Sequence, residues 1–109
     1  MKFDRKLWLQ INNTLRKREI DPSQIKWINC VKHHNVEAKS HFLAKASECY
    51  KLYQNEVPYL TEAWTNPNKN GRRRRYDILL LDGTNEIIEI ETSRKNKLKK
   101  RVTTIFCDE

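Results

Sequence analysis

"YDILLLDGTNEIIEIETS", residues 76–93, is the stretch that decides the fold. Residues 76–81 form a nearly continuous apolar run, which is typical of a strand covered on both faces. Residues 82–85, with a glycine after an aspartate, are a turn signal. Residues 86–92 then alternate between polar and apolar side chains, as a half-buried strand does. The two runs predict an antiparallel hairpin, and acidic residues interrupt both of them.

The acidic residues of this hairpin, Asp77, Glu89 and Glu91, can share one face of the sheet. Successive side chains alternate across a strand, so Glu89 and Glu91 point the same way. Asp77 joins them if it pairs with position 89 or 91, because directly opposed residues in an antiparallel pair point to the same side. That pairing needs a turn with an odd number of residues, such as 82–84. An even turn would put Asp77 on the opposite face.

Helical patterns precede the hairpin. In residues 3–18 apolar side chains recur every four residues, which predicts one amphipathic helix. Residues 23–31 can form a second, short helix after an Asp-Pro-Ser cluster. Asn35 can cap a longer helix over residues 36–54. The expected buried face of that helix consists of Val36, Phe42 or Leu43, Ala46, Tyr50 and Tyr53.

The remaining strands complete a sheet. Residues 59–65, "YLTEAWT", alternate as a strand and carry Glu62 at their centre, and residues 103–107 can form a last edge strand after a short basic helix. This order predicts a single α/β domain of the α+β type, with a central mixed sheet of about four strands, an antiparallel meander and flanking helices. Residues 1–35 would be an N-terminal helical extension and residues 36–109 the core.

The charge of the chain points to a polyanionic partner. The 109 residues include 22 Lys plus Arg against 14 Asp plus Glu, for a net charge of +8, and the excess gathers at residues 72–75 and 94–101. Such a balance favours nucleic acid, although a merely solvated basic surface is the alternative. Contacts to phosphate are expected from Arg72, Arg73, Arg74, Arg75, Lys45, Arg94, Lys95 and Lys97.

Other features narrow the class of protein. Cys30, Cys49 and Cys107 are dispersed, with no metal-binding spacing, as expected of a reduced chain. No apolar run reaches the roughly 18 residues of a membrane span, and residues 1–10 lack the apolar stretch of a secretory signal. We therefore expect a cytoplasmic protein with no membrane partner. The glycine-rich phosphate loop, the dinucleotide fingerprint and the hydrolase nucleophile elbow are absent from the sequence.

Carboxylates gathered on one sheet face predict a metal site. Left bare they would repel one another and cost several kcal/mol. Mg²⁺ or Mn²⁺ would remove that cost, because such ions prefer carboxylate oxygens, keep several waters and bridge to phosphate. An ion held by Asp77, Glu89 and Glu62 beside basic clusters predicts hydrolysis of phosphodiester bonds. The plain alternative is a solvent-facing sheet edge with no chemistry.

Residues 71–93, "GRRRRYDILLLDGTNEIIEIETS", preceded by "YLTEAW" and the helix "KSHFLAKASECY", resemble the PD-(D/E)xK nuclease superfamily. The family pattern is a helix, a strand bearing Glu, a strand bearing Asp, a turn and a strand ending in E-x-K, and the resemblance covers about residues 36–95. It is nearest to the archaeal Holliday-junction-resolvase and restriction-enzyme-like branches. The resemblance implies a restriction-endonuclease-like fold in which Asp77 is the central metal ligand and Glu89 the second.

The chain departs from the family pattern at Glu91, which occupies the position of the catalytic Lys. Some restriction endonucleases of this fold carry E-x-E, so the resemblance implies that Glu91 acts as a base or as a ligand for a second metal. Lys95 or Lys97 is the alternative source of the missing cation. Glu62 resembles the additional acid of resolvase-like members, and Glu48 is a weaker candidate for an outer ligand.

The predicted function is therefore that of a Mg²⁺- or Mn²⁺-dependent endonuclease, a hydrolase acting on duplex or branched DNA. A non-catalytic nucleic-acid-binding module with a degenerate nuclease fold is the alternative, and a small interaction protein with exposed acids is a third possibility. Small chains often need a dimer to span a duplex or junction, so a homodimer is also expected.

Overall fold

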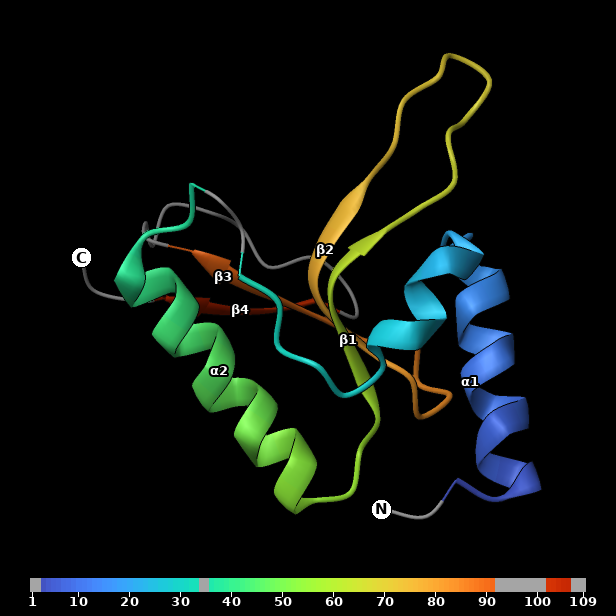
Figure 1. Ribbon diagram of the computed structural model, residues 1–109, viewed down its shortest axis with the longest axis horizontal. Helices are drawn as coiled ribbons and strands as arrows, with labels where there is room; N and C mark the ends of the chain where they lie inside the picture. Colours follow the sequence, from blue (N-terminus) through green and yellow to red (C-terminus); the bar gives the residue numbers. More distant parts are fainter. Residues whose placement is uncertain (1–2, 34–35, 92–101, 107–109) are drawn as a thin grey trace.

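The computed structural model describes residues 3–33, 36–91 and 102–106, whose arrangement is drawn in Figure 1. The elements in chain order are α1 (Arg5–Lys17), the 3₁₀ helix η1 (Pro22–Trp27), α2 (Lys39–Gln54), β1 (Tyr59–Trp64), β2 (Arg75–Leu80), β3 (Ile87–Glu91) and β4 (Val102–Phe106). Together they form a small α+β domain.

The strands lie side by side in the order β1-β2-β3-β4. β1, β2 and β3 are antiparallel neighbours, which confirms the predicted meander. β4 pairs with β3 in parallel. β2 is therefore an inner strand, and this position explains why its apolar run is nearly unbroken.

Helices cover both faces of the sheet, so the protein has two apolar cores (Figure 1). Neighbouring residues of β2 divide between them, with Leu79 in the core beside α1 and Ile78 in the core beside α2. The α1 core consists of Ile11, Leu15, Ile20, Leu60, Ala63, Tyr76, Leu79, Leu81 and Ile87. The α2 core consists of Cys49, Tyr59, Ile78, Leu80, Ile88 and Ile90.

Side-chain caps set the starts of the first two helical elements. The Asp4 carboxylate accepts a hydrogen bond from Leu7 N at 2.8 Å, so the helix predicted over residues 3–18 begins directly after Asp4. Asp21 caps η1 by accepting from Ser23 N at 3.0 Å. The short helix expected after Asp21 is thus present, as a 3₁₀ helix.

The buried face of α2 differs from the prediction. Val36, which precedes the helix, is 85% exposed, and Tyr50 and Tyr53 are also exposed. The face toward the sheet instead carries Lys45 and Cys49, both of which are buried. Apolar spacing missed this face because a lysine stands at its centre, and a lysine is buried only when partners elsewhere in the chain pair with it.

Some predicted features lie outside the described residues, namely the Asn35 cap and the short basic helix after Ser93. The visible start of α2 is Lys39, after Ala38, with no side-chain hydrogen bond at the cap. No helix within the described parts of the chain is both long and apolar enough to span a bilayer.

Candidate functional site

The site lies at a fork where β2 and β3 separate. Their antiparallel ladder is short, with Ile78 opposite Ile88 and Leu79 opposite Ile87. Beyond it the β1–β2 hairpin and β3 run in different directions (Figure 1). At the fork Asp77 Oδ2 accepts a hydrogen bond from Ile90 N at 2.8 Å, so a side chain takes the place of a backbone carbonyl as the acceptor.

The register settles which acids face one another. Because Ile78 is opposite Ile88, the next position along each strand sets Asp77 opposite Glu89, the arrangement that an odd-numbered turn was predicted to give. On the other side, Thr61 pairs with Ile78 two positions before Ala63 pairs with Tyr76, so Glu62 lies opposite Asp77. The three strands of the meander therefore each bring one acid to the fork.

Glu62 has an unusual backbone for a strand residue. Its φ of +48° lies in the left-handed region, which costs a residue with a Cβ roughly 1–3 kcal/mol. The side chain is nevertheless only 6% exposed, because two cations hold it. Arg75 Nη1 donates to Glu62 Oε2 and also to Asp77 Oδ1 at 3.1 Å. Arg75 thus joins the acids of β1 and β2.

Lys45 of α2 holds the acids from the other side. Its side chain has no exposed surface, and its Nζ donates to Glu37 Oε1 at 2.9 Å, Glu62 Oε1 at 3.3 Å and Lys32 O at 2.6 Å. A fully buried ammonium requires such partners, since an unpaired one would be very costly. The helix is therefore fastened to the sheet by an ion-pair network.

His41, one turn before Lys45, connects the network to Asp77. Its Nδ1 pairs with Glu37, and its Nε2 lies 3.7 Å from Asp77 Oδ2. His41 and Lys45 are four residues apart, so they lie on one face of α2. Glu37 was missed, although it stands four residues before His41 and so can reach it.

Glu89, unlike Glu62 and Asp77, forms no ion pair with Lys45 or Arg75. Burial, together with a hydrogen bond and charge repulsion from Asp77, raises the pKa of Glu89 to about 8, and Arg75 opposes this only weakly. Within the described residues neither Glu89 nor Glu91 belongs to an ion pair. The raised pKa therefore leaves Glu89 largely protonated at neutral pH.

The basic residues predicted to bind phosphate do not form one surface. Lys45 is buried, so the prediction that it contacts a nucleic-acid backbone is wrong in this conformation. Arg75 belongs to the acidic site, whereas the three preceding residues, Arg72, Arg73 and Arg74, line a separate pocket beside α1. Arg94, Lys95 and Lys97 lie outside the described residues.

Of the three predicted metal ligands, Asp77 and Glu89 lie side by side. In residues 3–33 and 36–91 no group of three or more His, Cys, Asp or Glu side chains is arranged to hold a metal ion. Asp77 and Glu89 remain neighbours, while Glu62 is engaged by Lys45 and Arg75. Glu48, the weaker candidate, pairs with Lys51 at 3.1 Å.

Comparison with known proteins does not assign this site. No family model matches the chain, and neither a curated protein nor a solved structure matches it.

Proposed function

We propose that this chain is a Mg²⁺- or Mn²⁺-dependent nuclease that cleaves DNA, with a restriction-endonuclease-like version of the α+β fold. The observation that carries the proposal is the pairing of Asp77 with Glu89 at the fork, where Glu62 completes a set of acids from three strands. Burial and the neighbouring Asp77 make the ionised form of Glu89 costly unless a cation lies beside it. A net charge of +8 on the same chain favours a polyanionic substrate.

The donor set fits a hard divalent ion. Mg²⁺ is commonly held by one or two protein carboxylates and completes its shell with waters and substrate phosphate oxygens. Asp77 and Glu89 would supply those two carboxylates, and the bond from Ile90 N orients the Asp77 group. When bound, the ion would supply charge neutralisation and a more acidic water.

The remaining residues have roles that follow from their positions. Glu91 is half-buried on the same face of β3 as Glu89, where it would accept the proton of the attacking water. The Arg75 side chain is 32% exposed, so its guanidinium can turn from Asp77 toward a phosphate. Lys45 and Arg75 would keep Glu62 in place as an outer acid.

A second function is favoured by one specific observation. Lys45 and Arg75 already pair with Glu62, and Arg75 also pairs with Asp77, so protein cations partly replace the metal. This arrangement suits a non-catalytic nucleic-acid-binding module that keeps the basic surface and has lost cleavage. Such a module would bind DNA equally well in chelator and with metal, with a steep dependence on salt.

Cleavage of labelled duplex, single-stranded and branched DNA and RNA, with Mg²⁺, Mn²⁺ or chelator, tests the proposal. We expect cleavage of DNA only with metal, and a loss of more than about a hundredfold in Asp77→Asn. Asparagine retains an oxygen that can accept from Ile90 N, so the variant removes charge without removing that hydrogen bond. Glu86→Gln is the matched control, because Glu86 is an exposed acid near the turn of the same hairpin.

Each outcome separates the two functions. Metal-dependent cutting that survives in Glu86→Gln and disappears in Asp77→Asn supports the nuclease. Binding of DNA without cutting in any metal, unchanged in Asp77→Asn, supports the binding module instead. Light scattering with and without duplex would test the homodimer that we propose from the small size of the chain.

A further inference from the structure

We infer that the α1 side of the molecule carries a separate nucleotide-binding surface, in which one pocket holds backbone phosphates and an adjoining pocket takes an unpaired base. The partner would be single-stranded nucleic acid or an unpaired nucleotide of a branched one. The inference deepens the proposed function and rests on it for the class of partner. It does not depend on cleavage.

The phosphate pocket lies between the end of α1 and the start of β2. It is a cavity of about 560 Å³ whose charged lining residues are Lys17, Arg18, Arg72, Arg73, Arg74 and Glu19. Five cations therefore face one acid. Guanidinium groups bind phosphate through two parallel hydrogen bonds, which makes this composition suited to a phosphodiester.

Some of these cations are fixed and others are free. Arg73 donates to Asp21 Oδ2 and to Thr65 O, both at 2.9 Å, and lies over the Trp64 ring at 5.4 Å. Arg72 and Arg74, by contrast, are exposed and have no acidic partner within the described residues. An anchored arginine with two free ones beside it is a partly preorganised anion site.

The four consecutive arginines, residues 72–75, thus lie at two different surfaces. Tyr76, two residues after Arg74, belongs to the core beside α1 and also lines the phosphate pocket. Arg75, between them, points instead to Glu62 and Asp77. Strand alternation therefore separates Arg75 from the phosphate pocket and assigns it to the acidic site.

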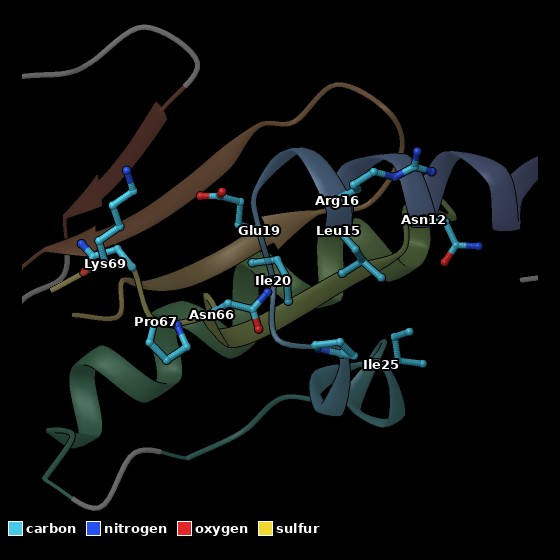
Figure 2. Close-up of a pocket in the computed structure, with 11 residues that line it drawn as sticks. Asn12, Leu15, Arg16, Glu19, Ile20, Ile25, Asn66, Pro67 and Lys69 are labelled. Atoms are coloured by element: carbon cyan, nitrogen blue, oxygen red, sulfur yellow. The ribbon is translucent and has the colours of Figure 1, made fainter. Parts of the chain in front are cut away.

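The base pocket adjoins the phosphate pocket. It is a cavity of about 640 Å³, within the usual range for small-ligand sites. Figure 2 shows Leu15 and Ile20 from α1 and the turn after it, Ile25 from η1 and Pro67 from the β1–β2 loop around this cavity. These apolar side chains form one part of the lining and can cover the flat face of a nucleobase. The polar and charged residues of the lining are Asn12, Arg16, Glu19, Asn66, Asn68 and Lys69.

Polar groups connect the two pockets. Glu19, Asn66 and Asn68 line both cavities, so the cavities adjoin each other. The backbone N of Asn66 donates to Glu19 O at 2.7 Å, and no partner for the Asn66 side-chain amide occurs among the described residues. A free amide beside an apolar floor can donate to and accept from the edge of a base. A base in a duplex is paired and stacked and does not enter such a pocket.

The first test measures binding in chelator, where cleavage cannot interfere. The probes are a short labelled single-stranded oligonucleotide and the duplex of the same sequence, followed by fluorescence anisotropy at several salt concentrations. We expect Arg72→Gln with Arg74→Gln to weaken single-strand binding by about tenfold or more. The plot of log affinity against log salt has a negative slope, and its steepness should decrease by about 1.4 because two phosphate contacts are lost.

The matched control is Arg5→Gln with Lys6→Gln, which removes the same charge from exposed residues at the far end of α1. Circular dichroism checks that both double variants fold. A control that weakens binding as much as Arg72→Gln with Arg74→Gln would overturn the inference, since binding would then follow net charge alone.

The second test separates base binding from charge. Ile25 is 39% exposed, so Ile25→Lys is tolerated by the fold while it fills the base pocket and adds a positive charge. If the pocket takes a base, single-strand affinity falls despite the added charge, and the preference over duplex shrinks. If affinity rises, attraction to the backbone is the whole effect and the base pocket is wrong.

The two proposals fail in different ways. If the protein cleaves DNA with metal but Arg72→Gln with Arg74→Gln binds as well as the wild type, the nuclease proposal is supported and the nucleotide-binding surface is wrong. Binding that responds to these variants without any cleavage does the reverse. A protein that binds none of the probes in chelator and cleaves no DNA with metal overturns both.

Discussion

Replacing Lys45 by methionine is expected to lower the free energy of unfolding by about 3–5 kcal/mol. The side chain is completely buried, and methionine has a similar length without the charge. The substitution leaves the carboxylates of Glu37 and Glu62, which are 2% and 6% exposed, without their shared ammonium. It also removes the donor to Lys32 O. Urea denaturation at neutral pH measures the change.

A control on the same helix makes this result specific. Lys51 pairs with Glu48 but is 64% exposed, so Lys51→Met should cost less than about 1 kcal/mol. Adding Glu62→Leu to Lys45→Met should recover part of the loss, because one of the unpaired carboxylates is then absent. Equal effects of the two lysine substitutions would contradict the assignment of Lys45 as the buried centre of the network.

The second prediction concerns the pH dependence of stability that Glu89 causes. Burial and its neighbour Asp77 raise the pKa of Glu89 to about 8 from an ordinary value of 4.5. Between these values the folded chain binds a proton that the unfolded chain has released. Stability from this residue is therefore complete below about pH 4.5 and is lost as the pH rises to about 8. Because Glu89 is only half-buried, we expect a loss on the order of 2 kcal/mol.

Glu89→Gln should remove this slope, because glutamine stays neutral at every pH, and should leave the protein more stable than wild type at pH 8. Thermal unfolding from pH 5 to pH 8 measures both effects. Added Mg²⁺ should stabilise the wild type more at pH 8 than at pH 5, and should do little for Glu89→Gln. A wild type with no extra slope over Glu89→Gln would show that Glu89 is solvated, and the acids at the fork would need no cation.

These predictions bear on why acids occupy the hairpin at all. Two cations of the protein, Lys45 and Arg75, neutralise Glu62 and one side of Asp77. Glu89 is left with a raised pKa. Ion pairs within the protein thus neutralise most of the acidic charge at the fork. The Asp77–Glu89 pair is the part for which we still propose a metal.

Local sequence patterns determined much of the fold. The positions of β1, β2 and β3 were predicted correctly from their apolar and alternating patterns, because strand periodicity depends only on neighbouring residues. The odd turn after β2 was one of two possibilities, and it set Asp77 opposite Glu89. The covering of both sheet faces also followed from the composition of β2.

The buried face of α2 was predicted wrongly for a physical reason. A helical stripe is read from apolar residues, and Tyr50 and Tyr53 satisfy that spacing while they remain exposed. Lys45 takes the buried position because Glu37 and Glu62 neutralise it. No local pattern reports partners that lie eight and seventeen residues away in the chain.

The amino-acid sequence by itself determined which segments become strands and which acids can meet, since both depend on short-range periodicity and on one turn. Only the tertiary structure decided what surrounds those acids. It set Arg75 against Glu62 and Asp77, and sent Arg74 to the opposite side of β2 beside α1. The reason is that charge compensation in a buried site depends on distances between elements, which a linear sequence does not contain.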